Sequence, residues 1–246
     1  MIKELDGRSI KKFLEIDFNN DSEIHDTKWY LERVPSSFYV FIDEDYIKDV
    51  SMLDRITTII NKDKITSCEF HGDALDHGFY CKPYWDWIEP LADYLRDKKV
   101  LDVMAGNGLI SMCLKYLGID IDACDRATGE DNEYVNYRCW NFPIISGEKY
   151  IEEQAKSGII YDTILMIWPE SEFNGDGTDK EICDVFLNSN PNGEIIFIGE
   201  DDMGGCTGSK ALFEAYKFEE IVELDKHYIP DWGYHDGIFR ATKIAK

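Results

Sequence analysis

The sequence predicts an α/β fold in which a mainly parallel sheet is doubly wound, with helices on both faces. Three observations favour this class. A strand, a glycine turn, a helix and a second strand follow one another within residues 99–126. Short apolar strands then alternate with helical segments along most of the remaining chain. The alternation ends in two consecutive strands.

The turn in the first unit contains two glycines. Residues 100–103 form an apolar strand, Gly106 and Gly108 follow it, and residues 109–117 carry apolar side chains at helical spacing. A second apolar strand comes next and ends at Asp125. This order of elements is typical of the opening half of a doubly wound sheet.

The same unit has the chemistry of a nucleoside-binding site. Gly106 and Gly108 can adopt positive φ and leave bare backbone against which a ligand can lie. The helix that begins near Gly108 presents unpaired N–H groups and the positive end of its dipole. Asp125 lies 17 positions after Gly108, close to the spacing of about 20 expected of a carboxylate that binds a ribose diol. We therefore expect a nucleoside cofactor here.

The rest of the chain predicts further elements in alternation. A helix is expected over residues 88–95, before the first strand, and another over residues 131–140, after the second. A possible third strand covers residues 142–146. Glu148 lies near its end, where a carboxylate could accept from the exocyclic amine of a base or simply lie at the surface. Later strands are expected over 161–168, 194–199, 218–224 and 237–244, and later helices over 179–187 and 209–216.

Two regions are expected along the chain. Residues 1–95 form a helical N-terminal extension or lid that packs on the core, and residues 96–246 form the ligand-binding domain. No linker rich in proline, glycine or serine separates them. Several aromatic side chains lie within residues 79–87. They either pack the extension against the sheet or cover a planar ligand, with Tyr80 and Tyr84 as the candidates for the second role.

The composition limits the kinds of partner. The chain has 246 residues, 44% of them hydrophobic, and a formal net charge of −23. This charge repels phosphate backbones, so a nucleic-acid substrate is disfavoured, and it can attract cationic molecules or simply keep the surface solvated. No run approaches the roughly 20 apolar residues of a membrane helix, and the N-terminus has no secretory apolar stretch. We expect a soluble, cytoplasmic protein with no membrane partner.

The seven cysteines follow neither a metal-binding nor a disulfide pattern. Their number is odd, and no two of them have the CxxC spacing. Several lie within apolar strand or helix patterns, as buried thiols do. We therefore expect mostly reduced core cysteines and no metal site.

With these features the chain resembles the class I S-adenosylmethionine-dependent methyltransferases. The likeness covers residues 78–246 and is carried by residues 100–108, Asp125, residues 191–193 and the terminal strand pair. The resemblance implies a Rossmann-like sheet of seven strands with the last strand antiparallel, and S-adenosyl-L-methionine as the cofactor. The cofactor-binding residues that it implies are Asp102, Gly106, Asn107, Gly108, Asp125 and Arg126, and Tyr80, Met104 and Trp168 are further candidates for binding the cofactor.

The chain departs from the family pattern at two places. Met104 stands where the family's D-x-G-x-G-x-G loop usually has its first glycine. Residues 167–170, Ile-Trp-Pro-Glu, replace the Asp, Asn or Ser, two prolines and aromatic residue of amino-methylating members, so chemistry on a nucleobase amine is not implied. A narrower likeness, to a poorly characterised set of methyltransferase-like proteins, is carried by residues 167–169, 198–200, 204–208, 229–232 and 235–236.

Ligands of an open α/β sheet bind beyond the carboxyl ends of its strands. Residues 168–170, 200–207 and 230–236 are expected to meet there. His235 is the candidate base or orienting residue, because imidazole can take up a proton at neutral pH. Asp236 or Glu200 would support it, and a purely structural histidine is the alternative. The candidate substrate-binding residues are Pro169, Glu170, Cys206, Thr207 and Trp232.

The leading functional hypothesis is methyl transfer from S-adenosylmethionine to a small-molecule or protein acceptor by in-line displacement. A non-catalytic binding or regulatory protein of the same fold is the alternative, favoured by Met104 and by residues 167–170. A nicotinamide dehydrogenase fits less well, because Ser111 stands where the third glycine belongs. Cys206 follows two glycines and could instead be a thiol nucleophile with His235 nearby. The acceptor atom and the oligomeric state stay open.

Overall fold

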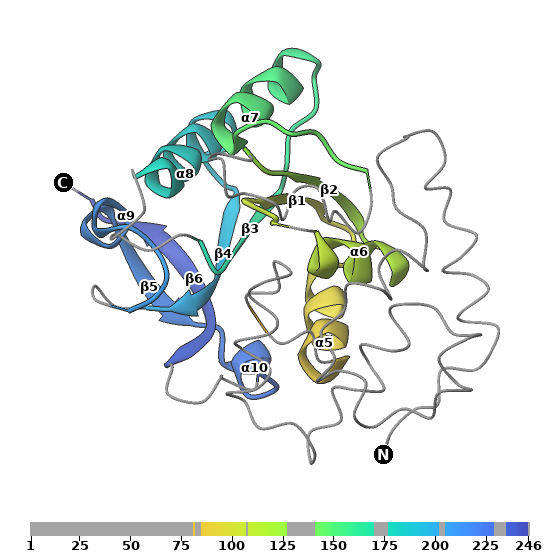
Figure 1. The fold of residues 1–246 in the computed structure, drawn as a ribbon, viewed down its shortest axis with the longest axis vertical. Helices are drawn as coiled ribbons and strands as arrows, with labels where there is room; N and C mark the ends of the chain where they lie inside the picture. The colour runs from red at the N-terminus through yellow and green to blue at the C-terminus, as the bar shows by residue number, and fades with distance from the viewer. Residues whose placement is uncertain are drawn as a thin grey trace, which may run out of the picture.

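The computed structural model describes residues 81, 85–106, 108–126, 141–169, 177–201, 205–228 and 235–245. Six strands in this part of the chain form one sheet between two layers of helices (Figure 1). The predicted α/β class is therefore confirmed. The strands are β1 (Lys99–Val103), β2 (Asp120–Cys124), β3 (Thr163–Ile167), β4 (Glu194–Glu200), β5 (Tyr216–Glu220) and β6 (Asp236–Lys243).

The sheet is mixed and Rossmann-like, with the strand order β2-β1-β3-β4-β6-β5. β1 pairs in parallel with β2 and β3, and β3 pairs in parallel with β4. β6 lies between β4 and β5 and runs antiparallel to both, with Phe239 opposite Phe197 and Ala241 opposite Phe218. The expected antiparallel last strand is confirmed. Because β6 is reversed, its first residues lie at the same edge as the carboxyl ends of β1 to β4.

The expectation of seven strands is wrong for the described part of the chain, because residues 142–146 do not form a strand. One bridge, between Asp125 and Ile144, is what joins this segment to the sheet. Pro143 has no N–H group to donate to a strand ladder. The Ile144 side chain is 51% exposed, so packing on the sheet stabilises it little. The chain instead enters an unpredicted helix, α7 (Gly147–Lys156).

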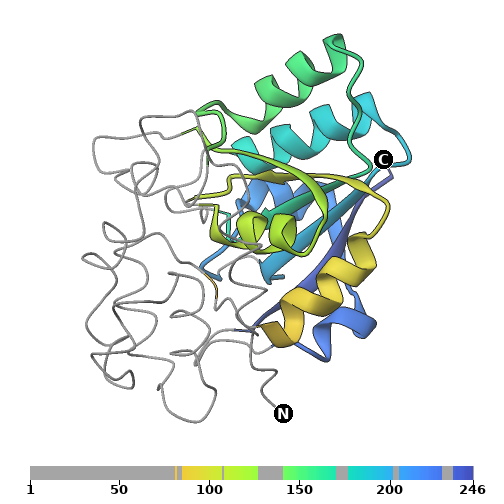
Figure 2. The same ribbon diagram turned by 90° about the vertical axis from the view of Figure 1, so that its right-hand side faces the viewer.

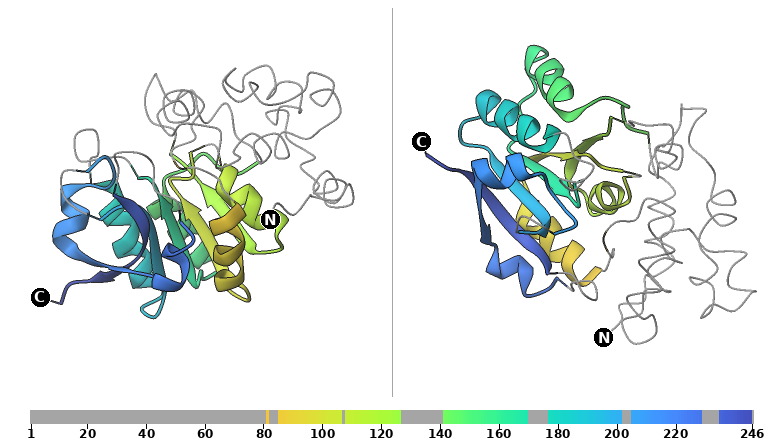
Figure 3. Two further views of the ribbon diagram at one scale, coloured as in Figure 1. Left: turned by 90° about the horizontal axis from the view of Figure 1, so that it is seen from below. Right: turned by 60° about the vertical axis from the view of Figure 1, so that its left-hand side comes forward.

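Helices cover both faces of the sheet, as Figures 2 and 3 show from the side and from below. α5, α6 and α10 pack on one face, and α7, α8 and α9 pack on the other. α7 and α8 lie side by side, as do α5 and α10. The remaining bounds are α5 (Trp85–Leu95), α6 (Leu109–Tyr116), α8 (Thr178–Ser189), α9 (Lys210–Ala215) and α10 (Val222–Asp225).

The central strands are buried on both sides, as their apolar runs predict. In β4, Ile196 and Ile198 belong to the core under α5 and α6, whereas Ile195 and Phe197 belong to the core under α7 to α9. Successive side chains of a strand point to opposite faces, so each apolar strand supplies both cores. Asp102 of β1 is a charged residue in such a buried position.

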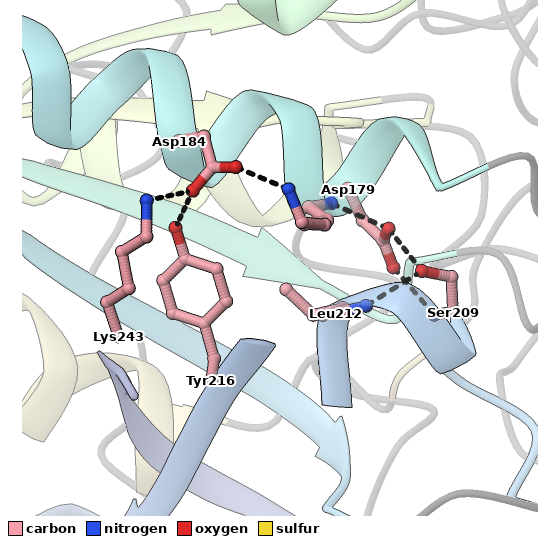
Figure 4. A network of polar contacts seen from close by, with 7 residues as sticks. Asp179, Asp184, Ser209, Leu212, Tyr216 and Lys243 are labelled. Carbon is pink, nitrogen blue, oxygen red and sulfur yellow. Dashed lines mark hydrogen bonds and ion pairs between the residues drawn. The ribbon is translucent and has the colours of Figure 1, made fainter. Parts of the chain in front are cut away.

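Polar contacts fasten α8 to the C-terminal part of the sheet (Figure 4). The Asp179 carboxylate accepts hydrogen bonds from the N–H and the hydroxyl of Ser209, at 2.6 and 2.7 Å. Ser209 is also the N-cap of α9. Further along α8, Asp184 accepts from the Tyr216 hydroxyl at 2.8 Å and from Lys243 Nζ at 2.6 Å. The start of α9, which follows the loop after β4, is therefore held in place.

The predicted N-terminal extension remains a prediction, and so does the boundary at residue 95, because residues 1–80 lie outside the described residues. The predicted helix over residues 131–140 lies outside them as well. α5, the last element before that boundary, buries Trp87 and Leu91 in the core on its face of the sheet.

Two predictions from composition can be compared with the structure. Four of the cysteines in the described ranges, Cys81, Cys113, Cys124 and Cys183, are buried, as expected, whereas Cys206 is exposed. Among the helices of these ranges, none has both the length and the apolar character needed to cross a membrane.

Candidate functional site

The loop after β1 has left-handed backbone at three residues. φ is 56° at Met104, 58° at Gly106 and 74° at Gly108, which is the N-cap of α6. Glycine adopts such angles easily, whereas a residue with a side chain loses roughly 1–2 kcal/mol. Met104 therefore holds a conformation that glycine favours, and the surrounding structure must impose it.

Hydrogen bonds hold this loop against the end of β2. The Ala105 N–H donates to the Cys124 carbonyl oxygen at 3.1 Å, and the Gly108 N–H donates to the Ala105 carbonyl oxygen at 2.8 Å. The Gly106 N–H donates to Asp125 Oδ2 at 2.8 Å. Asp125 thus lies against the glycine loop, on the side where a ribose-binding carboxylate is expected.

Asp102 is the buried carboxyl group beside this loop. Its side chain is 1% exposed, and no donor among the described residues reaches its Oδ1 atom. Burial raises the pKa of Asp102 to about 8; the Ser111 hydroxyl acts to lower this pKa, and the charge of Asp125 acts to raise it. A cation bound next to Asp102 would favour its ionised form.

The structure places some of the other predicted cofactor residues. Arg126 Nη1 donates to the Thr178 hydroxyl at 2.8 Å, so the guanidinium lies between the end of β2 and the start of α8. Tyr80 and Asn107 lie outside the described residues. Glu148, expected at the end of a third strand, lies in the first turn of α7. Its Oε2 atom is buried and has no hydrogen-bond partner within the described ranges.

The segment after β3 also has a residue with left-handed backbone. Trp168 has a φ of 48° and is 9% exposed, and its N–H donates to the Ile198 carbonyl oxygen at 2.7 Å. The next residue, Pro169, is buried and accepts through its carbonyl from the Gly208 N–H at 3.0 Å. Met104 and Trp168 therefore follow neighbouring strands with backbone conformations that are enriched at functional sites.

Glu200 joins three segments at the end of β4. Its Oε2 atom accepts from the Cys206 N–H, and its Oε1 atom accepts from the His235 N–H at 3.3 Å. The Thr207 hydroxyl accepts from the Glu200 N–H at 2.7 Å and donates to the Glu200 carbonyl oxygen at 3.2 Å. The Cys206 and His235 residues are exposed. The structure thus brings together four predicted site residues from distant parts of the sequence.

Asp236 lies opposite Glu200 in the β4–β6 ladder but has a different partner. The Tyr228 hydroxyl donates to Asp236 Oδ2 at 2.6 Å. Burial, with the nearby Cys81 thiol and the Asp236 carboxylate, raises the pKa of Tyr228, so the phenol stays protonated and can donate. Tyr228 is a site residue that the sequence does not predict, since an aromatic residue in a polar loop carries no pattern that pairs it with a particular carboxylate.

The remaining predicted substrate residues, Glu170 and Trp232, lie outside the described residues. No cluster of three or more His, Cys, Asp or Glu side chains in the described ranges is arranged to hold a metal ion. The described site residues form two groups at one edge of the sheet. The β1–β2 group comprises Asp102, Met104, Gly106, Gly108 and Asp125, and the β4–β6 group comprises Glu200, Cys206, Thr207, His235 and Asp236.

Comparison with solved structures adds distant structural likenesses, three of which follow. No protein-family model and no curated protein matches this chain. A SAM-dependent methyltransferase from Agrobacterium tumefaciens is 14% identical over 65% of this chain and 60% of its own length, with a TM-score of 0.36. A mutant of MtNAS is 10% identical over 97% and 96% of the two chains, with a TM-score of 0.41. WbdD is 13% identical over 71% and 42%, with a TM-score of 0.36. All three scores lie below 0.5, so the class of fold is assigned from this chain's own strand order and directions.

Proposed function

We propose that this protein transfers a methyl group from S-adenosylmethionine to a small-molecule or protein acceptor by in-line displacement. The β1–β2 group carries the proposal, because a glycine loop with left-handed backbone, the start of α6 and two carboxyl groups meet at one edge of the sheet. The antiparallel last strand adds an analogy of fold to the class I methyltransferases, which supports the proposal without establishing the activity.

The described residues fit this cofactor chemically. The buried Asp102 Oδ1 atom has no donor among the described residues, and an ammonium group such as that of the methionine end would supply one. Gly106 and Gly108 would offer bare backbone to the cofactor. Asp125 accepts one backbone N–H, and a carboxylate has further lone pairs for ribose hydroxyls. When bound, the cofactor supplies an electrophilic methyl group on a sulfonium.

The β4–β6 group is the proposed acceptor side. Displacement requires the nucleophile to be oriented and, where it carries a proton, to lose it. His235 is the proposed base, since it is exposed and its backbone N–H is held by Glu200. Cys206, Thr207 and Pro169 are the proposed lining of the acceptor site. The net charge of −23 favours a neutral or cationic acceptor over one that carries phosphate.

Calorimetric titration of the full chain tests the cofactor. We expect S-adenosylmethionine and S-adenosylhomocysteine to bind with a Kd on the order of micromolar, about 8 kcal/mol of binding free energy. NADH is the control for a dehydrogenase and should give no binding heat. If folded protein binds neither adenosyl compound, the proposed function is wrong.

Transfer of an isotope-labelled methyl group to metabolite and protein fractions tests the activity. We expect a labelled product with the wild-type chain and at least a ~100-fold loss of rate in His235→Ala, which removes the base. His227→Ala changes an exposed histidine beyond the end of α10 and should keep the wild-type rate. Cofactor binding without product in any fraction would instead favour the non-catalytic binding protein.

A further inference from the structure

Glu200 makes contacts unlike those of a general base. The residue is 7% exposed, and both of its carboxylate oxygens already accept backbone N–H groups. Cys206 donates to one oxygen, and His235 donates to the other at 3.3 Å. A carboxylate with both oxygens engaged by backbone donors is poorly placed to take a proton from a substrate.

Residues 205–207, which follow β4 in the described part of the chain, lie close against the same residue. A Cβ atom added at Gly205 would be 2.6 Å from Glu200 Oε2, so a side chain there would displace the carboxylate. A Cβ atom added at Gly199 would be 2.7 Å from Thr207 Oγ1. Thr207 itself bonds to the N–H and to the carbonyl oxygen of Glu200. The two glycines therefore allow the loop to fold onto the end of β4, with Glu200 beneath it.

The position of Glu200 in the sheet explains why its partners matter. Glu200 and Asp236 are directly opposite in an antiparallel pair, where like charges are destabilising. Each is 7% exposed, and each has its own donors. The Tyr228 hydroxyl donates to Asp236, whereas Glu200 takes its donors from the backbone of Cys206 and His235. The backbone N–H groups of Cys206 and His235 therefore offset part of the free-energy cost of burying the Glu200 carboxylate.

We propose that Glu200 is a positioning residue that fixes the backbone of Cys206 and His235, and thereby decides where the exposed thiol and imidazole stand at the acceptor side. Its importance for methyl transfer rests on the proposed function. The placement itself follows from the Glu200 contacts and holds whatever reaction the site carries out. Cys206 and His235 come from segments on either side of β5, and one carboxylate bridges them.

Amide hydrogen exchange of the full chain tests the positioning. Glu200→Ala removes both acceptors, and Glu200→Gln keeps the shape but leaves a single acceptor oxygen. We expect peptides containing Cys206 and His235 to exchange roughly tenfold faster or more in Glu200→Ala. In Glu200→Gln the single acceptor oxygen should keep the shorter bond, to the Cys206 N–H, so the His235 peptide should be the one that exchanges faster. Asp201→Asn, at the exposed neighbouring residue, is the matched control and should exchange at the wild-type rate.

The ring signals of histidine in NMR spectra separate positioning from general stability. We expect the His235 signals to shift in Glu200→Gln and those of His227 to stay unchanged. Wild-type exchange at Cys206 and His235 in a folded Glu200 variant, or an unmoved His235 signal, would overturn the proposal. If Glu200→Ala does not fold, Glu200→Gln decides. If the wild type does not bind S-adenosylhomocysteine, the proposed function is wrong. Amide exchange in the Glu200 variants still tests the positioning by itself.

Discussion

The two groups of residues at the carboxyl edge of the sheet differ in backbone strain and in whether their buried polar atoms have hydrogen-bond partners. In the β1–β2 group, Met104 has left-handed backbone and Asp102 has a buried oxygen without a donor in the described ranges. In the β4–β6 group, Glu200 has two backbone donors and Asp236 has the Tyr228 hydroxyl. One group is incomplete by itself, whereas the carboxylates of the other have partners within the protein.

This difference in hydrogen-bond partners favours different roles for the two groups. A buried polar atom without a partner costs free energy, and a folded protein keeps such an atom where a ligand completes it or where strain has a use. We therefore propose that the β1–β2 group binds the ligand and that the carboxylates of the β4–β6 group place the reactive side chains. Changes in the first group should alter ligand affinity, and changes in the contacts of the second should alter stability and order.

Replacement of Asp102 should give the largest effect. The folded chain keeps a proton on Asp102 up to a pKa of about 8, whereas the unfolded chain loses it near the ordinary value of 3.8. Wild-type stability should therefore fall as the pH rises from 4 to 8 because of this group, and Asp102→Asn should lack that loss. We expect the variant to be more stable at pH 9 by about 6 kcal/mol, and close to wild type near pH 4.

Urea unfolding at pH 4.5, 7 and 9 measures this difference. Asp120→Asn, at the exposed amino end of β2, is the matched control and should keep the wild-type pH dependence. The same Asp102→Asn protein should bind S-adenosylmethionine less tightly, because an amide cannot ionise beside a cation. Equal pH slopes for wild type and variant would show that Asp102 is not the titrating group.

Replacement of Asp179 should give the next largest effect, and on stability alone. Its buried carboxylate accepts from the N–H and hydroxyl of Ser209 at the start of α9. Asp179→Ala leaves those donors without their acceptor and should lower the free energy of unfolding by about 3 kcal/mol. Calorimetry should show S-adenosylhomocysteine affinity within twofold of wild type. Glu181→Ala, exposed in the same turn of α8, should change neither quantity.

Asp125→Ala should lower ligand affinity more than stability, the opposite of what we expect for Asp179→Ala. It removes the acceptor of the Gly106 N–H and the carboxylate proposed for the ribose. We expect S-adenosylhomocysteine affinity to fall about 30-fold, or about 2 kcal/mol, with a smaller loss of stability. Asp120→Ala, at the opposite end of β2, is the control for net charge. Unchanged affinity in Asp125→Ala would contradict the assignment of ligand binding to the β1–β2 group.

Met104→Gly should give the smallest effect. Glycine relieves the left-handed strain at φ 56° but loses more backbone entropy on folding, so the net gain in stability should be under about 1 kcal/mol. Met104→Ala keeps the strain and loses the packing of the methionine, so it should be the least stable of the three proteins. Thermal unfolding ranks them. An alanine variant more stable than the glycine variant would show that backbone strain is not what Met104 contributes.

Much of the fold could be predicted from local patterns. The apolar runs at β3 and β4 and the periodic residues of α6 indicated these elements within a few residues of their bounds. The strand predicted over residues 142–146 was wrong. These residues look apolar in sequence, but Pro143 and the exposed Ile144 keep them out of the sheet. Helix α7 is rich in charged residues, has few apolar ones and was not predicted.

The sequence by itself determined the class of fold and the residues of the glycine loop, because strand and helix periodicity and glycine turns are local properties of the chain. The tertiary structure decided which carboxyl groups have partners. Glu200 meets Cys206 and His235, and Asp236 meets Tyr228, because the reversed β6 brings the start of that strand to the end of β4. Such pairings depend on strand order and register, which no short stretch of sequence specifies.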